Sequence, residues 1–427
     1  MKRRLVAALA TAVGMVGLAA CSSGTPAPAA AVGSYSGQSI TVWLMSGDAP
    51  SAWQTAVTAQ FELAYPGAKL NLVTQSWTNI QQNVTQALSE LTPPDVVDIG
   101  NTQTAYYAST GGLLDLAPYV SELGGGDWSR TMNASALSGG VQYAAPWFAG
   151  LRVVMYNKAL WAKAKLSPPS TQQQFLNDLA TLQQTPGVDS ALWLPGQDWY
   201  DFDGFLQQEG ASIIARDSGG KWTGDLDTPA GRAAATLFKT FQSYGHAPMN
   251  ADETHPVEAT EFAKGDVASM IAMGYEAAAV LQANPSMADD IGWFPMPSPT
   301  AGVPAKTFLG GSNLAVAQNT SNRTLALGFL KIALNSANES AFAKESGFLP
   351  DTDSLYSALS GNAYGVAESK AAPYAGYTPL VPTWGRVENS PNPITTLFLT
   401  PVLQGQDVSP AADVADAEIT ARLNGGQ

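Results

Sequence analysis

The sequence predicts an α/β protein built on a parallel sheet and divided into two lobes. Strand and helix signals alternate between residues 40 and 99, an order that is typical of parallel sheets. Removing an export signal of 20 residues leaves 427 − 20 = 407 residues, more than one hydrophobic core usually holds. A hydrophobic content of 45% with 11 Trp, 14 Tyr and 14 Phe predicts a well-packed globular chain.

Hydrophobic periodicity defines the first elements. We expect strands at 40–44 (ITVWL), 69–75 (KLNLVTQ) and 95–99 (DVVDI). Ser51-Ala-Trp-Gln54 is a capping-box pattern opening a helix whose apolar stripe is Trp53, Val57, Phe61 and Ala64. A second helix presents Ile80, Val84, Ala87, Leu88 and Leu91 and ends at Pro93-Pro94. Because ligands of such sheets bind beyond the carboxyl ends of strands, the loops near Ser46, Ser76 and Gly100 are candidate binding loops.

Later segments are more helical, and the sequence has no internal repeat. Thr228 caps a predicted helix with Pro229 in its first turn and an apolar face of Ala233, Leu237, Phe238 and Phe241. Asp217–Lys221 is turn-rich, and Trp222 beside it is interpreted as packing a hairpin. A loop at 295–304 and a strand at 308–318 precede a helix through Leu325, Phe329 and Ile332, and Ser409-Pro410 begins the last helix.

The N-terminus has the pattern of an export signal. Lys2-Arg3-Arg4 precedes an uncharged run from Leu5 to Leu18, whose 14 residues are fewer than the roughly 18 expected of a spanning helix. Leu18-Ala19-Ala20-Cys21 resembles the lipobox of bacterial lipoproteins, which implies a lipidated Cys21 at the mature N-terminus. An ordinary secretory signal ending near a cysteine is the alternative. Residues 21–37, rich in Pro, Ala, Gly and Ser, predict a flexible linker.

Charge and cysteine content exclude several classes of function. Without Lys2, Arg3 and Arg4 the chain has 18 basic and 35 acidic residues, a formal charge of −17, which repels nucleic acid. Cys21 is the only cysteine, so no disulfide, Cys-rich metal site or thiol catalysis is expected. His246 and His255 lack zinc-binding spacing, and Asp201-Phe-Asp203-Gly204 is too short for a calcium loop. We expect no cofactor and no metal.

No short motif of an enzyme supports catalysis. The chain has no Gly-x-Ser-x-Gly elbow and no phosphate-binding glycine loop, and Ser218-Gly-Gly-Lys221 is interpreted as a turn. A glycosidase needs two carboxylates about 5–10 Å apart, which Asp198, Asp201, Asp203 and Glu276 leave open. A secreted glycoside hydrolase is therefore retained as an alternative.

A series of motifs, in order, resembles the extracellular solute-binding proteins (family 1, carbohydrate-uptake type) of bacterial ABC importers. The motifs are Pro94–Asn101 (PDVVDIGN), Gly112–Leu116, Tyr143–Pro146 with Tyr156-Asn157-Lys158, Gly265–Met270, Phe294–Pro297, Gly310–Val316, Phe329–Ile332 and Gly347–Pro350. The resemblance spans about residues 39–423. It implies a two-lobe periplasmic-binding-protein-like (type II) fold with hinge strands and a central ligand cleft. The implied lobes are 38–147 with 308–352, and 148–307 with 353–427.

In the first lobe, topology and resemblance select the same loops. Asp48 follows the first strand, Trp77 the second, and Asn101 with Gln103 the third. The structural alternative is that Asp48 caps the next helix and Trp77 packs under it. Trp147 and Phe148 lie beside the hinge strand implied by the resemblance and serve either ligand binding or packing between the lobes.

In the second lobe, Asp198, Trp199 and Tyr200 form a polar and aromatic cluster after a Pro-Gly turn. Tyr275 and Glu276 replace the family's Gly-x-Trp-type pattern, which leaves Tyr275 as the substitute platform. Gly311 and Ser312 either let the backbone approach a ligand or satisfy a turn. Trp384 and Arg386 lie in a Pro-rich loop where relatives often use an aromatic residue or an arginine.

The sequence thus predicts a monomeric, lipid-anchored receptor on the outer face of a bacterial cell membrane, with no catalysis. It would bind a mono- or oligosaccharide and deliver it to the permease of an ABC transporter. Sugars need flat aromatic surfaces and many hydrogen-bonding groups, and several of the tryptophans fall in predicted loops. The alternative cargo is a glycerophosphodiester or a polyol, although Arg152 and Arg386 are the only arginines near the candidate loops. Replacing Trp199 or Trp384 by alanine is expected to weaken binding without unfolding the protein.

Overall fold

The computed structural model describes residues 35–425 of the chain. The chain divides into two units, residues 1–34 and 35–427, and only the second is described below. The predicted signal peptide (1–20), Cys21 and the linker up to Ser34 lie outside the described residues.

The larger of the two main sheets has seven strands. Its order is β13-β6-β12-β3-β1-β2, and β14 pairs with the start of β12. The strands are β1 (Ser39–Met45), β2 (Lys69–Gln75), β3 (Val96–Gly100), β6 (Ala145–Leu151), β12 (Thr307–Val316), β13 (Leu349–Pro350) and β14 (Ala375–Gly376). Both β2 and β3 pair with β1 in parallel, which confirms the parallel sheet predicted from residues 40–99.

The smaller of the two main sheets is antiparallel and has three strands, with β7 at its centre. Its order is β10-β7-β11, and two short hairpins, β4-β5 and β8-β9, stand apart. The strands are β7 (Val153–Asn157), β10 (Ser269–Ala272), β11 (Ile291–Phe294), β4 (Leu137–Ser138), β5 (Val141–Gln142), β8 (Ile214–Arg216) and β9 (Trp222–Gly224). Only Arg152 separates β6 in the large sheet from β7 in the small one, so this residue lies at the junction of the two sheets.

Helices surround both sheets. They are α1 (Ser51–Ala64), α2 (Ile80–Ser89), α3 (Thr104–Ser109), α4 (Arg130–Ala134), α5 (Lys158–Lys163), α6 (Gln172–Gln183), α7 (Trp199–Gln208), α8 (Pro229–Gln242), α9 (Glu258–Phe262), α10 (Gly274–Ala283), α11 (Arg323–Ala333), α12 (Ser336–Ser346), α13 (Ala363–Ala371), α14 (Gly385–Glu388), α15 (Thr400–Leu403) and α16 (Val408–Leu423). Shorter 3₁₀ segments cover Ala117–Leu123, Pro285–Met287, Asp353–Gly361 and Ala372–Tyr374, and a π-helical turn covers Ile394–Leu399.

The helix predictions hold in position but not in every detail. Trp53, Val57 and Phe61 of α1 are buried as expected, but the capping box is wrong, because Ser51 is already helical and Pro50 is the N-cap. Leu91 is 96% exposed beyond the end of α2, since that helix stops at Ser89.

Helix α8 begins as predicted but turns a different face inward. The Thr228 hydroxyl accepts a hydrogen bond from the Gly231 N–H, which confirms the predicted cap. Ala233 is exposed, and Ala234 and Ala235 are buried beside Phe238 and Phe241.

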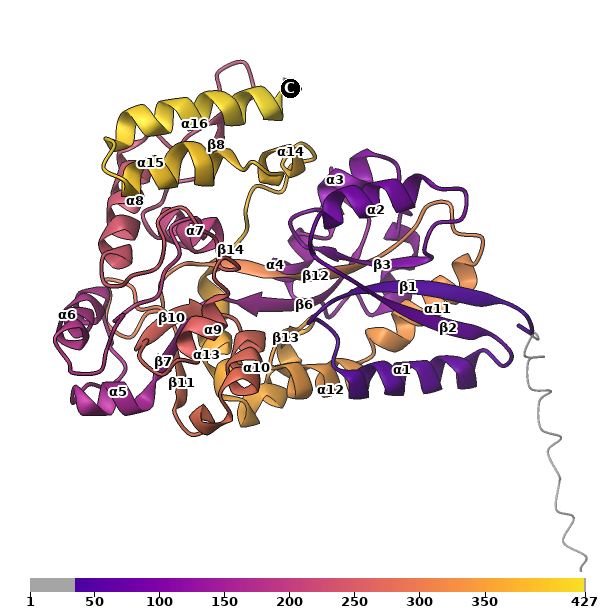
Figure 1. Ribbon diagram of the computed structural model, residues 1–427. Coiled ribbons are helices and arrows are strands. Elements are labelled where there is room, and N and C mark those ends of the chain that lie inside the picture. Colours follow the sequence, from indigo (N-terminus) through magenta and orange to yellow (C-terminus); the bar gives the residue numbers. More distant parts are fainter. Residues whose placement is uncertain (1–34, 426–427) are drawn as a thin grey trace, which may run out of the picture. The chain divides into compact units, whose positions relative to one another are not determined.

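The buried apolar residues separate around the two sheets. One core joins β1 and α1 to β12 and α11, and another joins β7 and α6 to α8 and α16. Strands β6 and β12 run through the middle of the described region, with α1–α3 on one side and α5–α8 on the other (Figure 1). This arrangement matches the predicted two-lobe α/β fold. Tyr364 and Ala367 of α13 pack in the core around the large sheet, and the boundaries of the lobes remain a prediction.

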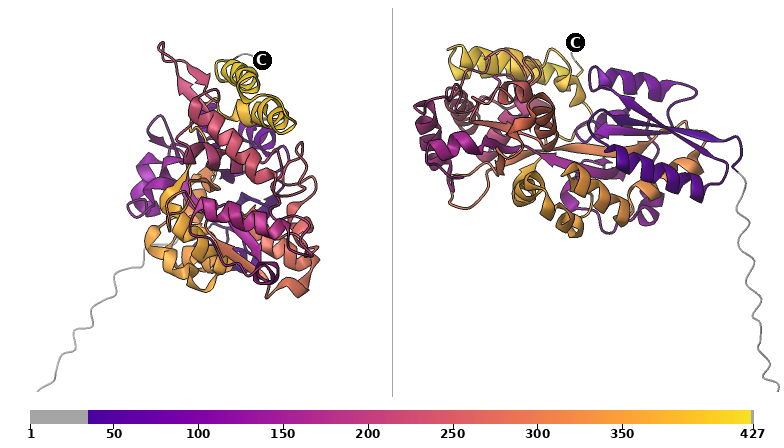
Figure 2. Two further views of the ribbon diagram at one scale, coloured as in Figure 1. Left: turned by 90° about the vertical axis from the view of Figure 1, so that its left-hand side faces the viewer. Right: turned by 60° about the horizontal axis from the view of Figure 1, so that its bottom comes forward.

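The end of the chain is fixed to the lobe that contains the small sheet. The side chain of Asp416 in α16 accepts hydrogen bonds from the N–H groups of Leu226 and Asp227, at 2.9 and 3.0 Å. Figure 2 shows α16 beside the β8-β9 hairpin, where Arg216 stacks 4.1 Å from the centre of the Trp222 ring. This confirms the predicted role of Trp222 in the hairpin.

The pairing of β6 with β12 explains one of the glycines in the predicted site. Gly311 has a φ of +126°, and a Cβ atom there would lie 2.2 Å from the Phe148 carbonyl oxygen. A register shift follows directly, between Ser312 and Asn313. The glycine is therefore needed by the sheet itself.

Candidate functional site

The loop after β1 brings Asp48 into contact with Ser312 of β12. The Ser312 hydroxyl donates a hydrogen bond of 3.1 Å to the Asp48 carboxylate. Asp98 lies beside Asp48 and accepts a hydrogen bond of 2.9 Å from the Met45 N–H. Burial raises the pKa of Asp98 to about 6, and burial together with repulsion from Asp98 raises the pKa of Asp48 well above its usual range. Burial and the neighbouring Asp98 thus both disfavour the charged form of Asp48.

Asn101 and Gln103 extend this group toward Trp77. Asn101 is held by β12, because its backbone N–H bonds to Gly311 and its side-chain amide to Leu309, both at 2.9 Å. The Gln103 side-chain oxygen accepts a hydrogen bond of 3.0 Å from the Tyr107 hydroxyl. A Cβ atom on Gly100 would lie 3.6 Å from both the Trp77 ring and the Gln103 oxygen. Trp77 is 41% exposed, so part of its surface is open to a ligand.

In the second lobe, a buried arginine organises the carboxylates. Arg152 bonds to Asp198 at 2.9 Å and forms longer ion pairs with Asp201 at 3.7 Å and Glu253 at 3.5 Å. Asp198 is the N-cap of α7 and accepts the Asp201 N–H at 3.1 Å. The N-cap position thus fixes the start of α7 against the junction of the two sheets.

Two further carboxyl groups complete this set, which we call the Arg152 cluster: Arg152, Asp198, Asp201, Glu253, Glu258 and Glu276. Glu276 on α10 accepts the Met273 N–H at 2.6 Å, and the Glu258 carboxyl group on α9 lies against Glu276. Neither oxygen of Glu258 receives a hydrogen bond from an N–H or hydroxyl donor. A bond between Glu258 and Glu276 therefore requires that one of them be protonated. Burial is the largest influence on all five carboxyl groups and raises the pKa of each.

Aromatic rings form a row beside this cluster. The rings of Tyr200 and Phe308 stack at 4.5 Å, and Tyr200 and Trp199 lie 4.0 Å apart. Trp384 continues the row at 6.0 Å from Trp199. The row therefore runs from the crossover strand β12 across the first turn of α7 to the start of α14.

One polar contact joins the loop after β3 to α14. The Thr102 hydroxyl donates to one oxygen of Glu388 at 3.2 Å, and the Trp384 indole N–H donates to the other at 2.7 Å. Burial raises the pKa of Glu388 to about 7, and these two hydrogen bonds oppose that shift. Candidate residues from both sides of the crossover strands are thus connected through Glu388.

Other predicted site residues lie apart from these groups. Trp147 and Phe148 are buried in a cluster of aromatic rings with Trp53 and Phe342, inside the core around the large sheet rather than in packing between the predicted lobes. Arg386 is exposed, and its guanidinium lies near Gly425 at the end of α16. Tyr275 is 47% exposed in the first turn of α10, next to Glu276.

Several residues that join these groups were not among the site residues predicted from the sequence. Arg152 carries the only charge between Tyr143 and Asn157, and a lone cation in an apolar run must find buried partners. This lone charge could have identified Arg152 as a candidate site residue from the sequence. Phe308, Thr102 and Glu388 carry no comparable local signal, because their contacts span large separations in sequence.

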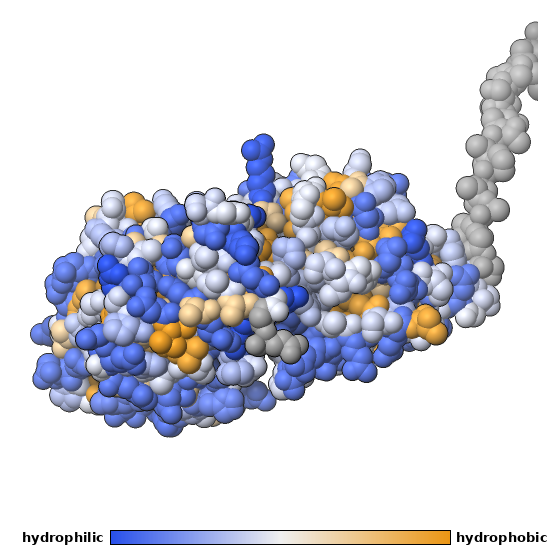
Figure 3. All heavy atoms as spheres, turned by 90° about the horizontal axis from the view of Figure 1, so that it is seen from above, coloured by the Kyte–Doolittle hydropathy of each residue, from blue (hydrophilic) through white to orange (hydrophobic). Residues whose placement is uncertain are grey.

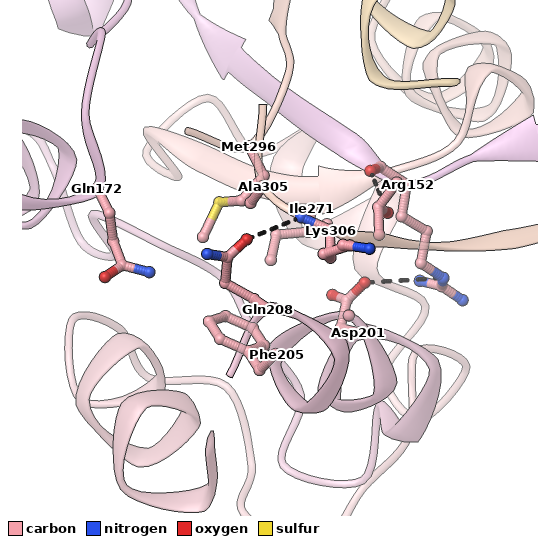
Figure 4. Close-up of a pocket in the computed structure, with 11 residues that line it drawn as sticks. Arg152, Gln172, Asp201, Phe205, Gln208, Ile271, Met296, Ala305 and Lys306 are labelled. Carbon is pink, nitrogen blue, oxygen red and sulfur yellow. Dashed lines mark hydrogen bonds and ion pairs between the residues drawn. The ribbon is translucent and has the colours of Figure 1, made fainter. Parts of the chain in front are cut away.

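A small cavity opens on the side of the Arg152 cluster that faces Lys306. Its volume is about 20 Å³, and Asp201, Phe205 and Gln208 of α7 line it together with Arg152 and Lys306 (Figure 4). Such a volume holds one water molecule and is too small for a sugar ring. Within residues 35–425, no group of three or more His, Cys, Asp or Glu side chains is arranged to hold a metal ion.

The face shown in Figure 3 is mostly hydrophilic, with hydrophobic residues in scattered groups. None of the helices in the described part of the chain combines the length and apolarity needed to cross a membrane.

Comparisons with known proteins agree with this architecture. The family model "Bacterial extracellular solute-binding protein" matches residues 46–340. The diacetylchitobiose binding protein DasA of Streptomyces coelicolor is 44% identical over 99% of both chains. The GacH receptor of Streptomyces glaucescens, solved unliganded and with acarbose, has a TM-score of 0.78 at 23% identity and covers 91% of this chain and 99% of its own.

A second similar structure is UgpB of Mycobacterium tuberculosis in complex with glycerophosphocholine. Its TM-score is 0.73 at 24% identity, over 91% of this chain and 99% of its own. At such identities the likeness concerns the fold. The extensive family match and the 44% identical relative establish that this chain belongs to the bacterial extracellular solute-binding proteins.

Proposed function

We propose that this protein is the sugar-binding component of an ABC importer and that it holds an oligosaccharide between its two lobes. The observation that carries the proposal is the pair of half-buried rings of Trp199 and Tyr200, 4.0 Å apart, which lies beside buried carboxyl groups and packs on the buried rings of Phe308 and Trp384. Aromatic faces suit the C–H surfaces of sugar rings, and carboxylates accept hydrogen bonds from hydroxyl groups.

Diacetylchitobiose is the first candidate ligand. The 44% identical relative is described as a diacetylchitobiose binding protein and aligns over 99% of this chain. Such a disaccharide offers hydroxyl and amide donors to the acceptors of the Arg152 cluster and of Asp48. Trp77 and Tyr275, the two exposed aromatic side chains among the candidate residues, supply flat surfaces for its rings.

Binding would proceed by closure of the lobes, here assigned to 38–147 with 308–352 and to 148–307 with 353–427. A ligand that contacts both lobes favours the closed state by its difference in affinity for the two states. With this assignment, the hydrogen bond from Thr102 to Glu388 joins the two lobes.

The remaining parts of the proposal concern location and partners. The predicted linker ends earlier than Gly37, because the Tyr35 ring packs on Tyr65 at 5.3 Å and its N–H bonds to the Pro66 carbonyl oxygen. Lipidation of Cys21 and a linker that ends before Tyr35 would tether a monomeric domain at the outer face of the membrane, within reach of the permease subunits. The family is named for extracellular proteins, which supports a position outside the cytoplasm.

A phosphodiester cargo is less well supported than a sugar. A phosphate group needs free cationic or N–H donors, whereas the Arg152 guanidinium already faces three carboxylates. Hydrolysis is also disfavoured, because the family and the 44% identical relative are binding proteins.

The test is binding of diacetylchitobiose, maltose and glycerophosphocholine to residues 22–427, measured by thermal shift and calorimetry. We expect stabilisation by diacetylchitobiose that follows RT ln(1 + [L]/Kd) and no release of monosaccharide on prolonged incubation. A shift with glycerophosphocholine alone, or cleavage of the sugar, would overturn the proposal.

A further inference from the structure

We propose that a groove beside the predicted sugar site holds further sugar units, so that the protein binds oligosaccharides of three or more units more tightly than disaccharides. The groove lies between α7, the β8-β9 hairpin and residues 377–382, and we call it the hairpin groove. This inference rests on the proposed function and adds a preference for chain length to it. Because a disaccharide does not need the hairpin groove, the two proposals can fail separately.

The first argument is size. The hairpin groove has a volume of about 580 Å³, within the range of about 300–1,000 Å³ that small-molecule sites occupy. Asp203, Gln207, Arg216, Trp222 and Tyr377 are among the residues that line it. The cavity at the Arg152 cluster, by contrast, has a volume of about 20 Å³. The hairpin groove therefore has room for sugar rings, which that cavity does not.

The second argument is continuity with the predicted site. Tyr200, Asp203 and Gln207 are spaced by three and four residues on α7, so they share one face of the helix. The Tyr200 ring on this face belongs to the aromatic row, and Asp203 and Gln207 line the hairpin groove. Burial raises the pKa of Asp203 to about 7, and repulsion from Glu388 contributes to the shift. Asp203 thus lies near Glu388, which also accepts the indole N–H of Trp384.

The third argument is the position of Tyr377. Its backbone carbonyl oxygen accepts a hydrogen bond of 3.4 Å from the Gln207 amide, and its hydroxyl donates to the Thr131 carbonyl oxygen on α4. Tyr377 and Thr131 fall in different predicted lobes. A residue that lines the hairpin groove therefore reaches the boundary between these lobes, where we place the disaccharide.

The fourth argument is a buried acceptor that lacks a donor. Asp203 is 3% exposed, and one of its carboxylate oxygens accepts a hydrogen bond of 2.6 Å from the Gln207 amide. The other oxygen receives no hydrogen bond from any residue between 35 and 425. A buried acceptor without a donor costs free energy, and a sugar hydroxyl in the hairpin groove would supply the donor.

The opposite side of the hairpin groove also suits a carbohydrate. The Arg216 guanidinium stacks over the Trp222 ring at 4.1 Å and donates a hydrogen bond of 2.7 Å to the Gly220 carbonyl oxygen. Within the described residues its other N–H groups have no acceptor. A flat surface with N–H donors at its edge fits the C–H face and the hydroxyl groups of a sugar ring. Because the Asp203 carboxylate in the same groove repels anions, a neutral ligand is favoured over a phosphate.

The experiment compares diacetylchitobiose with its three-unit and four-unit homologues, triacetylchitotriose and tetraacetylchitotetraose, on residues 22–427 by calorimetry. We expect the third unit to raise the affinity at least fivefold. Hydrogen exchange of the backbone N–H groups in residues 211–216 should slow with the three-unit sugar and not with the disaccharide. Equal affinities for the three sugars, or unchanged exchange in residues 211–216, would overturn this inference.

Two variants locate the third sugar unit. Arg216→Gln and Asp203→Asn should each remove most of the fivefold gain and change the affinity for diacetylchitobiose less than threefold. The control is Arg323→Gln, which replaces an exposed arginine on α11 and should change neither affinity. Since Arg216 is exposed, Arg216→Gln remains a test if Asp203→Asn does not fold.

The outcomes separate the two proposals. A gain from the third unit that persists in both variants would overturn this inference, and so would equal losses for the two-unit and three-unit sugars. Tight binding of diacetylchitobiose with no gain from a third unit would leave the proposed function in place and remove the hairpin groove from the site. Failure of every sugar to bind would overturn the proposed function, and this inference with it.

Discussion

Thr102 donates a hydrogen bond of 3.2 Å to Glu388, a residue 286 positions further along the chain. Glu388 also accepts the indole N–H of Trp384, so one carboxylate fixes the loop after β3 and the aromatic row together. This contact joins residues that we assign to different lobes, which makes it a natural point to test closure.

Removing the Thr102 hydroxyl should loosen the contact between the lobes. We expect Thr102→Val to cost about 0.5–1.5 kcal/mol in the free energy of unfolding, the usual worth of one hydrogen bond. The ligand-free protein should also show a larger radius of gyration in small-angle scattering. Thr58→Val, which loses a hydroxyl bonded within α1, is the control and should leave the radius unchanged. An unchanged radius in both variants would contradict a role of Thr102 in closure.

Glu388 should make stability depend on pH. Because burial raises its pKa from 4.5 to about 7, Glu388 favours the folded state most at low pH, and this contribution is lost as pH rises to about 7. The free energy of unfolding of the wild type, minus that of Glu388→Gln, should therefore fall between pH 4.5 and 7.5. Denaturant unfolding at several pH values measures this difference, and a difference that rises with pH would be incompatible with the burial of Glu388.

Trp77 should contribute to binding and little to folding. Its ring is 41% exposed, so we expect Trp77→Ala to weaken sugar binding at least tenfold while reducing stability by less than about 1 kcal/mol. Leu91→Ala replaces a side chain that is 96% exposed and should affect neither property. Calorimetry and thermal unfolding of the two variants check this, and wild-type affinity in Trp77→Ala would remove Trp77 from the site.

Trp384 should behave differently from the expectation based on the sequence. Its side chain is completely buried, so Trp384→Ala should destabilise the protein by about 3–5 kcal/mol in addition to any effect on binding. Trp384→Phe keeps a ring and loses only the N–H that bonds to Glu388, which separates packing from hydrogen bonding. Near wild-type stability of Trp384→Ala in denaturant unfolding would show that the residue is exposed in solution.

Gly311 should tolerate no side chain. A Cβ atom would lie 2.2 Å from the Phe148 carbonyl oxygen at a φ of +126°, so Gly311→Ala should separate β6 from β12 and cost more than about 3 kcal/mol. Gly126→Ala, at an open position with nothing within 4 Å, should fold normally. Soluble expression and thermal unfolding compare the two, and equal stability would mean that the strands are not paired as described.

Much of the fold follows from local patterns. The alternation in 69–75 and the stripe of Trp53, Val57 and Phe61 predict β2 and most of the buried face of α1, because each depends on neighbours in sequence. The capping box at Ser51 failed because the helix had already begun there, and Leu91 continued an apolar stripe past the helix end at Ser89.

The candidate site was predictable only in part. Asp48, Asn101 and Asp198 follow strands or turns that the sequence reveals, and the structure gives each of them buried partners. Glu258 could not be predicted, because no local pattern in the sequence marks it. Its carboxyl group contacts that of Glu276, which lies on a different helix.

The sequence by itself determined the parallel order of the first strands, the Thr228 cap, the acidic character of the chain and the family to which it belongs. Only the tertiary structure decided that Arg152 gathers five carboxyl groups, that Trp384 is buried and that Thr102 meets Glu388. The physical reason is that periodicity and turn chemistry act between close neighbours. Burial and the pairing of charges depend instead on segments that are distant in sequence. These segments come together where β6 and β12 cross between the two sheets.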